Sequence, residues 1–264
     1  SARPFEARET WIRFNCSALS LLLSVLGVPV GPKASSDWRL PEWLRTAPKW
    51  HKRLFLAAFF GAELTSPATM TGHAKTFPSP SLTVVKRAGH VESGLAFLSD
   101  VASLLEDLGV RSTIISPSIE VRRDVGGNSI RLRLQVACDT PNLLGLWGQV
   151  GFEYNHKRSL LASLAVGYLR SKQAALAVRD GIRARILELR GATGEGATTL
   201  LKAVGGTESG VNLRFVARTI YGRGDRVLRA HEAFPTFEEW RRVVTTGLGR
   251  SGLFWDEVES LAPR

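Results

Sequence analysis

The chain has 264 residues, of which 44% are hydrophobic, and its formal net charge at pH 7 is +11. That apolar content supports a packed core, and the excess of positive charge favours a polyanionic partner, nucleic acid before membrane, although a basic protein without such a partner is the plainer alternative. The apolar run 18–30 is too short to cross a bilayer and two cysteines form no disulfide framework, so we expect a cytoplasmic protein with no membrane partner.

Helical and strand-like periodicity alternate in the first part of the chain. Apolar residues at helical spacing predict helices over residues 16–26, 54–62, 91–108 and 142–151. Alternating or β-branched runs predict strands over residues 71–77, 81–87, 111–123 and 128–138. From residue 54 onward the order is helix, two strands, helix, two strands, helix, which is an α+β fold.

The second half of the chain is mainly helical. Residues 156–190 have no strand pattern, and their last part is strongly basic. Residues 197–204 and 209–221 flank Gly205-Gly206 and have the shape of a helix-turn-helix, a weak signal by itself. A helix over residues 237–244 and a strand over residues 253–261 are predicted at the end.

The stretch 54–64 is an apolar run that ends in a single acid, Glu63. Small side chains at helical spacing allow a second helix to approach closely, and this stretch has four of them, Ala57, Ala58, Gly61 and Ala62. Glu63 would then lie at the end of a close-packed helix pair, where a carboxylate suits metal binding. By pattern alone, an ordinary core helix with a solvated Glu63 is the more common explanation.

Residues 56–64, Leu-Ala-Ala-Phe-Phe-Gly-Ala-Glu-Leu, resemble the LAGLIDADG motif of homing endonucleases in register, with Gly61 where that family often has Asp. Weaker similarity covers nearly the whole chain, including residues 26–33, 41–44, 148–155 and 234–240. The resemblance is greatest to the inteins inside archaeal RNA-splicing ligases.

This resemblance implies an αββαββα repeat with a saddle-shaped antiparallel sheet over residues 50–155, preceded by the end of another repeat in residues 1–49. Residues 156–222 would be a helical segment with a helix-turn-helix-like unit, and residues 223–264 a helix and strand that lead toward the splicing half of an intein. The resemblance also identifies Glu63 as the catalytic, metal-binding acid and Mg²⁺ as the cofactor. A second LAGLIDADG repeat, from an upstream segment or a second subunit, would supply the partner acid.

Residues 146–154 can also be aligned to a second motif, in which Glu153 takes the place of Glu63. No second ββαββ pattern follows them, so we interpret residues 142–155 as the closing helix of the repeat. A second motif is the alternative.

Residues 130–136 alternate strictly, with Arg131, Arg133 and Gln135 on one face of the predicted strand. Because Arg and Gln read guanine and adenine edges, we expect this face to lie in the major groove of DNA; a merely solvated face is the alternative. Further DNA contacts are predicted for His73, Lys75, Arg87, Arg122 and Arg123, and in the helical unit for Arg214, Arg218 and Arg223. Lys86 is predicted to lie on the same surface and to assist at the scissile phosphate.

The expected function is sequence-specific cleavage of double-stranded DNA by an intein-borne endonuclease, with Mg²⁺ held at Glu63. The alternatives are a DNA-binding remnant that no longer cuts and an RNA maturase-like binding protein. Where the family often carries Lys, before its closing helix, this chain has Cys138-Asp139-Thr140, which favours the remnant.

Overall fold

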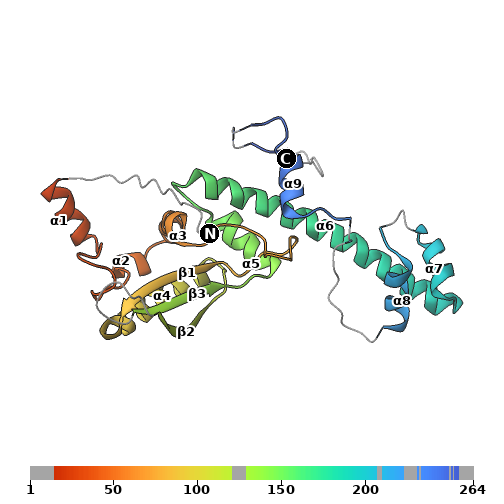
Figure 1. The fold of residues 1–264 in the computed structure, drawn as a ribbon, viewed down its shortest axis with the longest axis horizontal. Coiled ribbons are helices and arrows are strands. Elements are labelled where there is room, and N and C mark those ends of the chain that lie inside the picture. The colour runs from red at the N-terminus through yellow and green to blue at the C-terminus, as the bar shows by residue number, and fades with distance from the viewer. Residues whose placement is uncertain are drawn as a thin grey trace, which may run out of the picture.

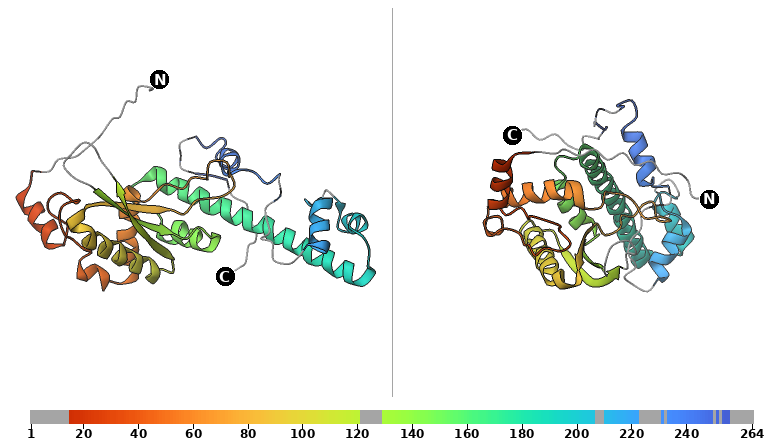
Figure 2. Two further views of the ribbon diagram at one scale, coloured as in Figure 1. Left: turned by 60° about the horizontal axis from the view of Figure 1, so that its bottom comes forward. Right: turned by 60° about the vertical axis from the view of Figure 1, so that its left-hand side comes forward.

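The computed structural model describes residues 15–120, 129–206, 210–222, 231, 233–249, 251 and 253–255. A sheet-containing unit lies at one end of the molecule and a small group of helices at the other (Figure 1). The long helix α6 (His156–Thr193) begins against the sheet unit and carries the second group at its far end, and Figure 2 shows the same arrangement from two further directions. None of the helices in the described ranges is long and apolar enough to span a membrane.

The sheet has three antiparallel strands in the order β1-β3-β2. These are β1 (Ser81–Arg87), β2 (Ser112–Glu120) and β3 (Ser129–Val136). A short 3₁₀ turn, η1 (Ala88–His90), leads from β1 into α4 (Val91–Asp107), which packs against all three strands. The apolar stripe of α4 meets the apolar face of the sheet and forms the main core, which includes Phe97, Leu98, Val101, Leu104, Leu105, Leu82, Leu132 and Leu134.

Several shorter helices complete the sheet unit. α3 (Lys49–Glu63) packs on α4, and the π-helical turn η2 (Gly145–Val150) continues α5 (Thr140–Leu144) and contacts both α3 and α6. The Asp139 side chain caps α5, and Asn155 caps α6 by accepting from the backbone N–H of Arg158 at 3.1 Å. Upstream lie α2 (Glu42–Arg45) and α1 (Ser17–Val25), and no residue of α1 is buried.

The far end of α6 forms a three-helix unit with α7 (Ala197–Ala203) and α8 (Leu213–Tyr221). Its own small core consists of Ile186, Leu200 and Val216. α9 (Phe237–Val244) returns to the first half of α6, where its aromatic residues surround the buried Tyr168. Burial raises the pKa of Tyr168 to about 12, and its hydroxyl donates to the Pro235 carbonyl at 3.0 Å.

The predicted helices over residues 91–108, 156–190, 197–204 and 237–244 are confirmed, as are the three strands that form the sheet. The predicted strand over residues 71–77 is wrong. Residues 70–76 form a tight turn in which Gly72 has a φ of +75°, and the Ala74 carbonyl accepts from Phe237 N of α9 instead of from a strand. The described order from residue 49 is therefore helix, strand, helix, two strands, helix. The predicted end of the hairpin, residues 121–128, and most of the predicted strand 253–261 lie outside the described residues.

Candidate nucleic-acid interface

The sheet face turned away from α4 carries the predicted arginines. β3 alternates as expected, with Leu132, Leu134 and Val136 buried against the core and Arg131, Arg133 and Gln135 on the opposite side. We call this side the outer sheet face. Its residues are Arg131, Arg133 and Gln135, their cross-strand partners, and Arg87, which lies on the same side of β1: Ser81, Thr83, Val85, Arg87, Thr113, Ile115, Ser118, Arg131, Arg133 and Gln135.

The outer sheet face is basic at its centre, where Arg131, Arg133 and Gln135 are half-buried, and it is exposed around them. Thr83 and Ile115 flank Arg133 on the neighbouring strands, and both are exposed. Arg87 is exposed on the same face. The face thus presents guanidinium groups and one amide among hydroxyl side chains and the apolar Val85 and Ile115, and such groups can contact phosphates and base edges.

Lys86 does not belong to this surface, which corrects its predicted role. Because successive side chains of a strand point to opposite faces, Lys86 lies on the same side of β1 as Leu82 and Val84, toward the core, where it is fully buried. Its Nζ donates to the Ser36 carbonyl at 2.7 Å and lies 4.9 Å from the centroid of the Trp38 ring. Burial lowers the pKa of Lys86, and the charge of Asp37 partly opposes that shift. A scissile phosphate cannot reach an ammonium group in this position.

His73 and Lys75 lie on the side of α6 and α9 instead of on the outer sheet face. His73 is exposed in the turn that replaces the predicted strand. Lys75 donates to the His231 carbonyl at 3.4 Å, and its own carbonyl accepts from Lys172 of α6 at 2.6 Å. Their contacts therefore separate them from Arg131 and Arg133. Arg122, Arg123 and Arg223 lie outside the described residues.

Glu63 lies at the exposed end of α3, and α3 makes a close backbone contact. The contact is with a non-helical segment and the start of α6, and not with the side of a second helix as we expected. The partner is the segment 151–158: Glu153 N donates to the Ala57 carbonyl at 2.9 Å, and Asn155 Nδ2 donates to the Gly61 carbonyl at 2.7 Å. A Cβ at Gly61 would collide with the Glu153 carbonyl oxygen. The seam between α3 and 151–158 therefore depends on a small residue at position 61.

The carboxylates of the two aligned motifs have different ionic partners, although the Glu153 backbone lies against α3 between Ala57 and Gly61. Glu153 forms an ion pair with Arg53 at 3.1 Å, and Glu63 lies 4.0 Å from Lys33 Nζ.

Mg²⁺ prefers a cluster of oxygen ligands, and the described residues contain no group of three or more His, Cys, Asp or Glu side chains that could hold a metal. Glu63 by itself supplies a single carboxylate, with Lys33 Nζ 4.0 Å away, which is fewer oxygen ligands than Mg²⁺ prefers.

The three-helix unit presents a second basic surface. Arg214 and Arg218 are both exposed, one turn apart on α8. Behind them, Arg179 of α6 lies 4.6 Å from the centroid of the Phe215 ring and donates to the Gly210 carbonyl, and burial lowers the pKa of Arg179. The half-buried Arg179 joins α6 to α8 and the segment before it, while Arg214 and Arg218 face solvent.

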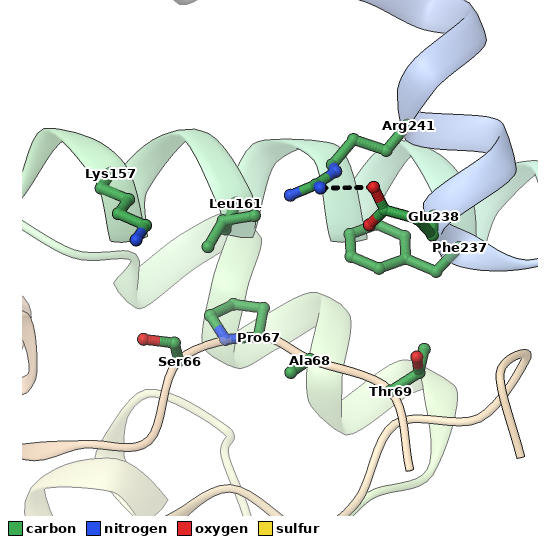
Figure 3. Close-up of a pocket in the computed structure, with 9 residues that line it drawn as sticks. All are labelled: Ser66, Pro67, Ala68, Thr69, Lys157, Leu161, Phe237, Glu238 and Arg241. Atoms are coloured by element: carbon green, nitrogen blue, oxygen red, sulfur yellow. Dashed lines mark hydrogen bonds and ion pairs between the residues drawn. The ribbon is translucent and has the colours of Figure 1, made fainter. Parts of the chain in front are cut away.

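A pocket of about 360 Å³ lies between the loop after α3, the start of α6 and α9 (Figure 3). Pro67, Leu161 and Phe237 provide apolar walls, while Lys157 and Arg241 point toward it from α6 and α9. Arg241 is bound to Glu238 at 2.6 Å, so one of the two cations is already partly neutralised. The sequence contained no signal for this pocket, because its residues come from three distant segments.

No family model and no solved structure matches the chain. It is 32% identical over 232 residues to tRNA-splicing ligase RtcB of Pyrococcus furiosus, an alignment that covers 88% of this chain and 22% of that protein. With tRNA-splicing ligase RtcB of Methanopyrus kandleri it shares 30% identity over 245 residues, 92% of this chain and 23% of the relative. DNA-directed RNA polymerase subunit Rpo1N of Methanocaldococcus jannaschii is 29% identical over 163 residues, 62% of this chain and 12% of that subunit. The chain thus spans less than a quarter of the length of these relatives.

Proposed function

We propose that this chain is a double-stranded DNA-binding module of the LAGLIDADG kind, carried as an intein-borne insertion within longer proteins. The observation that carries the proposal is the outer sheet face, which combines the exposed Arg87 with the half-buried Arg131, Arg133 and Gln135 on one antiparallel surface. A twisted antiparallel sheet can enter the major groove, where arginine and glutamine side chains distinguish bases.

The insertion part of the proposal is supported by the names of the relatives. Similar segments occur in proteins named as a tRNA-splicing ligase and as an RNA polymerase subunit, and in each the segment is a minor part of the whole. Two such different activities are not explained by one shared segment. A module with its own function, present in both, accounts for the similarity.

Binding without cutting fits the described residues best. Glu63 is exposed at the end of α3, but its nearest charged partner is Lys33, and Glu153 is paired with Arg53. Lys86, the predicted basic assistant, is buried. The DNA-binding remnant is therefore favoured over the endonuclease.

RNA binding is the second candidate, and one observation favours it. Relatives at 32% and 30% identity are named tRNA-splicing ligases, so a module within them could contact RNA. The same basic surfaces would serve, since phosphate contacts do not by themselves distinguish the two nucleic acids.

Binding-site selection from a random duplex library, followed by competition with tRNA, tests the proposal. We expect a preferred duplex sequence that tRNA does not displace. Arg133→Gln should shift one selected position from guanine toward adenine and weaken the original site by about 1–3 kcal/mol, while Glu63→Gln should bind as the wild type does. Displacement of the duplex by tRNA would favour the RNA candidate. The proposal would be contradicted if the chain bound no nucleic acid, or if it cleaved DNA with Mg²⁺ and Glu63→Gln abolished that cleavage.

A further inference from the structure

Tyr154 combines two unusual features. Its side chain is 90% exposed, the highest value among the exposed large hydrophobic residues that the structure describes. Its φ is +58°, and within the described ranges it is the one non-glycine residue with a positive φ. A bulky residue in this left-handed region is strained, and such strain persists where surrounding contacts fix the backbone.

The residues on both sides of Tyr154 are fixed to α3. Before it, Glu153 N donates to the Ala57 carbonyl and the Glu153 carboxylate is paired with Arg53 at 3.1 Å. After it, Asn155 donates to the Gly61 carbonyl and caps α6. These contacts hold the chain in a conformation that directs a tyrosine side chain into solvent, although burial of the ring would be more favourable for the isolated protein.

A cation lies close to Tyr154 in the chain. Lys157 is exposed on the first turn of α6. Glu153, the acid next to it, is neutralised by Arg53.

The end of α3, which the segment 151–158 contacts, also reaches strand β1. Leu64, at the end of α3, forms a β-bridge with Leu82, next to the Ser81–Gln135 pair. An exposed aromatic ring near an exposed cation is the combination that binds an unstacked nucleobase and its phosphate.

We infer that Tyr154 stacks on a nucleobase that is extruded from, or unpaired in, the bound nucleic acid. This inference rests on the proposed function and adds a contact that strand and helix surfaces do not provide. The strained backbone keeps the ring extended before the nucleic acid arrives, so little conformational entropy is lost on stacking.

The test compares Tyr154→Asn with Tyr154→Phe in the full chain. Asparagine tolerates the left-handed conformation but has no ring, whereas phenylalanine keeps the ring. The probes are the selected duplex, fully paired, and the same duplex with one bulged 2-aminopurine whose fluorescence reports stacking.

We expect the wild type and Tyr154→Phe to quench the bulged base and to prefer the bulged duplex. Tyr154→Asn should lose the quenching and bind the bulged duplex roughly tenfold more weakly. Its affinity for the paired duplex should stay unchanged, and its melting temperature should equal or exceed that of the wild type.

An unaltered preference in Tyr154→Asn would overturn the inference, as would equal affinity of the wild type for the two duplexes. An equal loss on both duplexes would indicate a general surface role for the ring and would also overturn it. A wild-type chain that binds neither duplex would instead refute the proposed function, so the two failures are distinguishable.

Discussion

At the scale of single residues, Lys86 fastens the segment before α2 to the sheet. Its ammonium group reaches out of the core to the Ser36 carbonyl, and its stem fits beside Gly94 of α4, where a Cβ would come within 2.8 Å of Lys86 Cγ. The neighbouring Asp37 carboxylate accepts from His90 Nδ1 at 2.9 Å, and Arg39 binds the buried Asp100 at 2.6 Å. Lys86 thus makes one of several polar contacts that join residues 36–39 to β1, η1 and α4.

Replacing Lys86 should therefore affect stability and not nucleic-acid binding. Lys86→Ala removes the buried stem and the charged hydrogen bond, so the free energy of unfolding should fall by about 2–4 kcal/mol in urea denaturation. Lys86→Met keeps most of the stem and should lose less. Lys202→Met, on the exposed surface of α7, is the matched control and should leave stability unchanged. Weaker duplex binding by correctly folded Lys86→Met would support the catalytic-surface role that we reject.

The pH dependence of unfolding gives a second measurement on the same residue. Because burial lowers the pKa of Lys86 below its ordinary value of 10.5, the unfolded chain binds more protons there than the folded chain between the two pKa values. The Lys86 contribution to the free energy of unfolding should therefore rise with pH through this window. Lys86→Met should abolish that rise, and an identical slope in wild type and variant would show that Lys86 does not titrate differently on folding.

At the scale of elements, the seam between α3 and the segment 151–158 organises the sheet unit. Arg158 Nη1 donates to the Phe60 carbonyl at 2.9 Å and to the Leu64 carbonyl, so the last carbonyls of α3 are satisfied by the start of α6. Small residues on α3 allow this backbone approach. The seam joins two elements that are nearly 100 residues apart in the chain.

A pair of glycine substitutions tests the seam. Gly61→Ala would place its Cβ against the Glu153 carbonyl oxygen, a backbone atom that cannot easily move, and should lower the free energy of unfolding by about 1–3 kcal/mol. Gly181→Ala lies in α6 with nothing within 4 Å of the new Cβ, so it should raise the free energy of unfolding by about 0.5–1 kcal/mol. Thermal unfolding monitored by circular dichroism would measure both, and equal shifts of the same sign would contradict the close seam.

The elements that the sequence predicted well are those whose local pattern also determines their packing. α4 and β3 have one apolar face each, and those faces meet in the core, so periodicity was sufficient. The prediction for Lys86 was wrong although the sequence contained the necessary signal. Alternation along β1 puts Lys86 on the same side of the strand as Leu82 and Val84. The turn at Gly72 and the strained Tyr154 could not be predicted, since each is fixed by hydrogen bonds to segments far away in the sequence.

At the scale of the whole molecule, α6 separates two basic surfaces. Its 38 residues span about 57 Å at about 1.5 Å per residue, with the sheet unit at one end and the three-helix unit at the other (Figure 1). The first part of the helix is buried in the main core and Ile186 in the second. Between them the surface is mostly exposed, so a long duplex could contact both ends without replacing any core packing.

Charge reversal on α8 tests whether the three-helix unit contacts phosphate. Arg218→Glu should weaken duplex binding and make the plot of log binding constant against log salt concentration less steep by about 0.9, the value for one lost phosphate contact. The double variant Arg214→Glu/Arg218→Glu should reduce the slope by about twice that amount. Arg170→Glu is the matched control, an exposed arginine in the stretch of α6 between the two units, and its slope should equal that of the wild type. If Arg170→Glu reduced the slope as much as Arg218→Glu, overall charge would explain the binding and α8 would have no specific contact. If the α8 variants kept both the affinity and the slope of the wild type, the outer sheet face would have to account for nucleic-acid binding by itself.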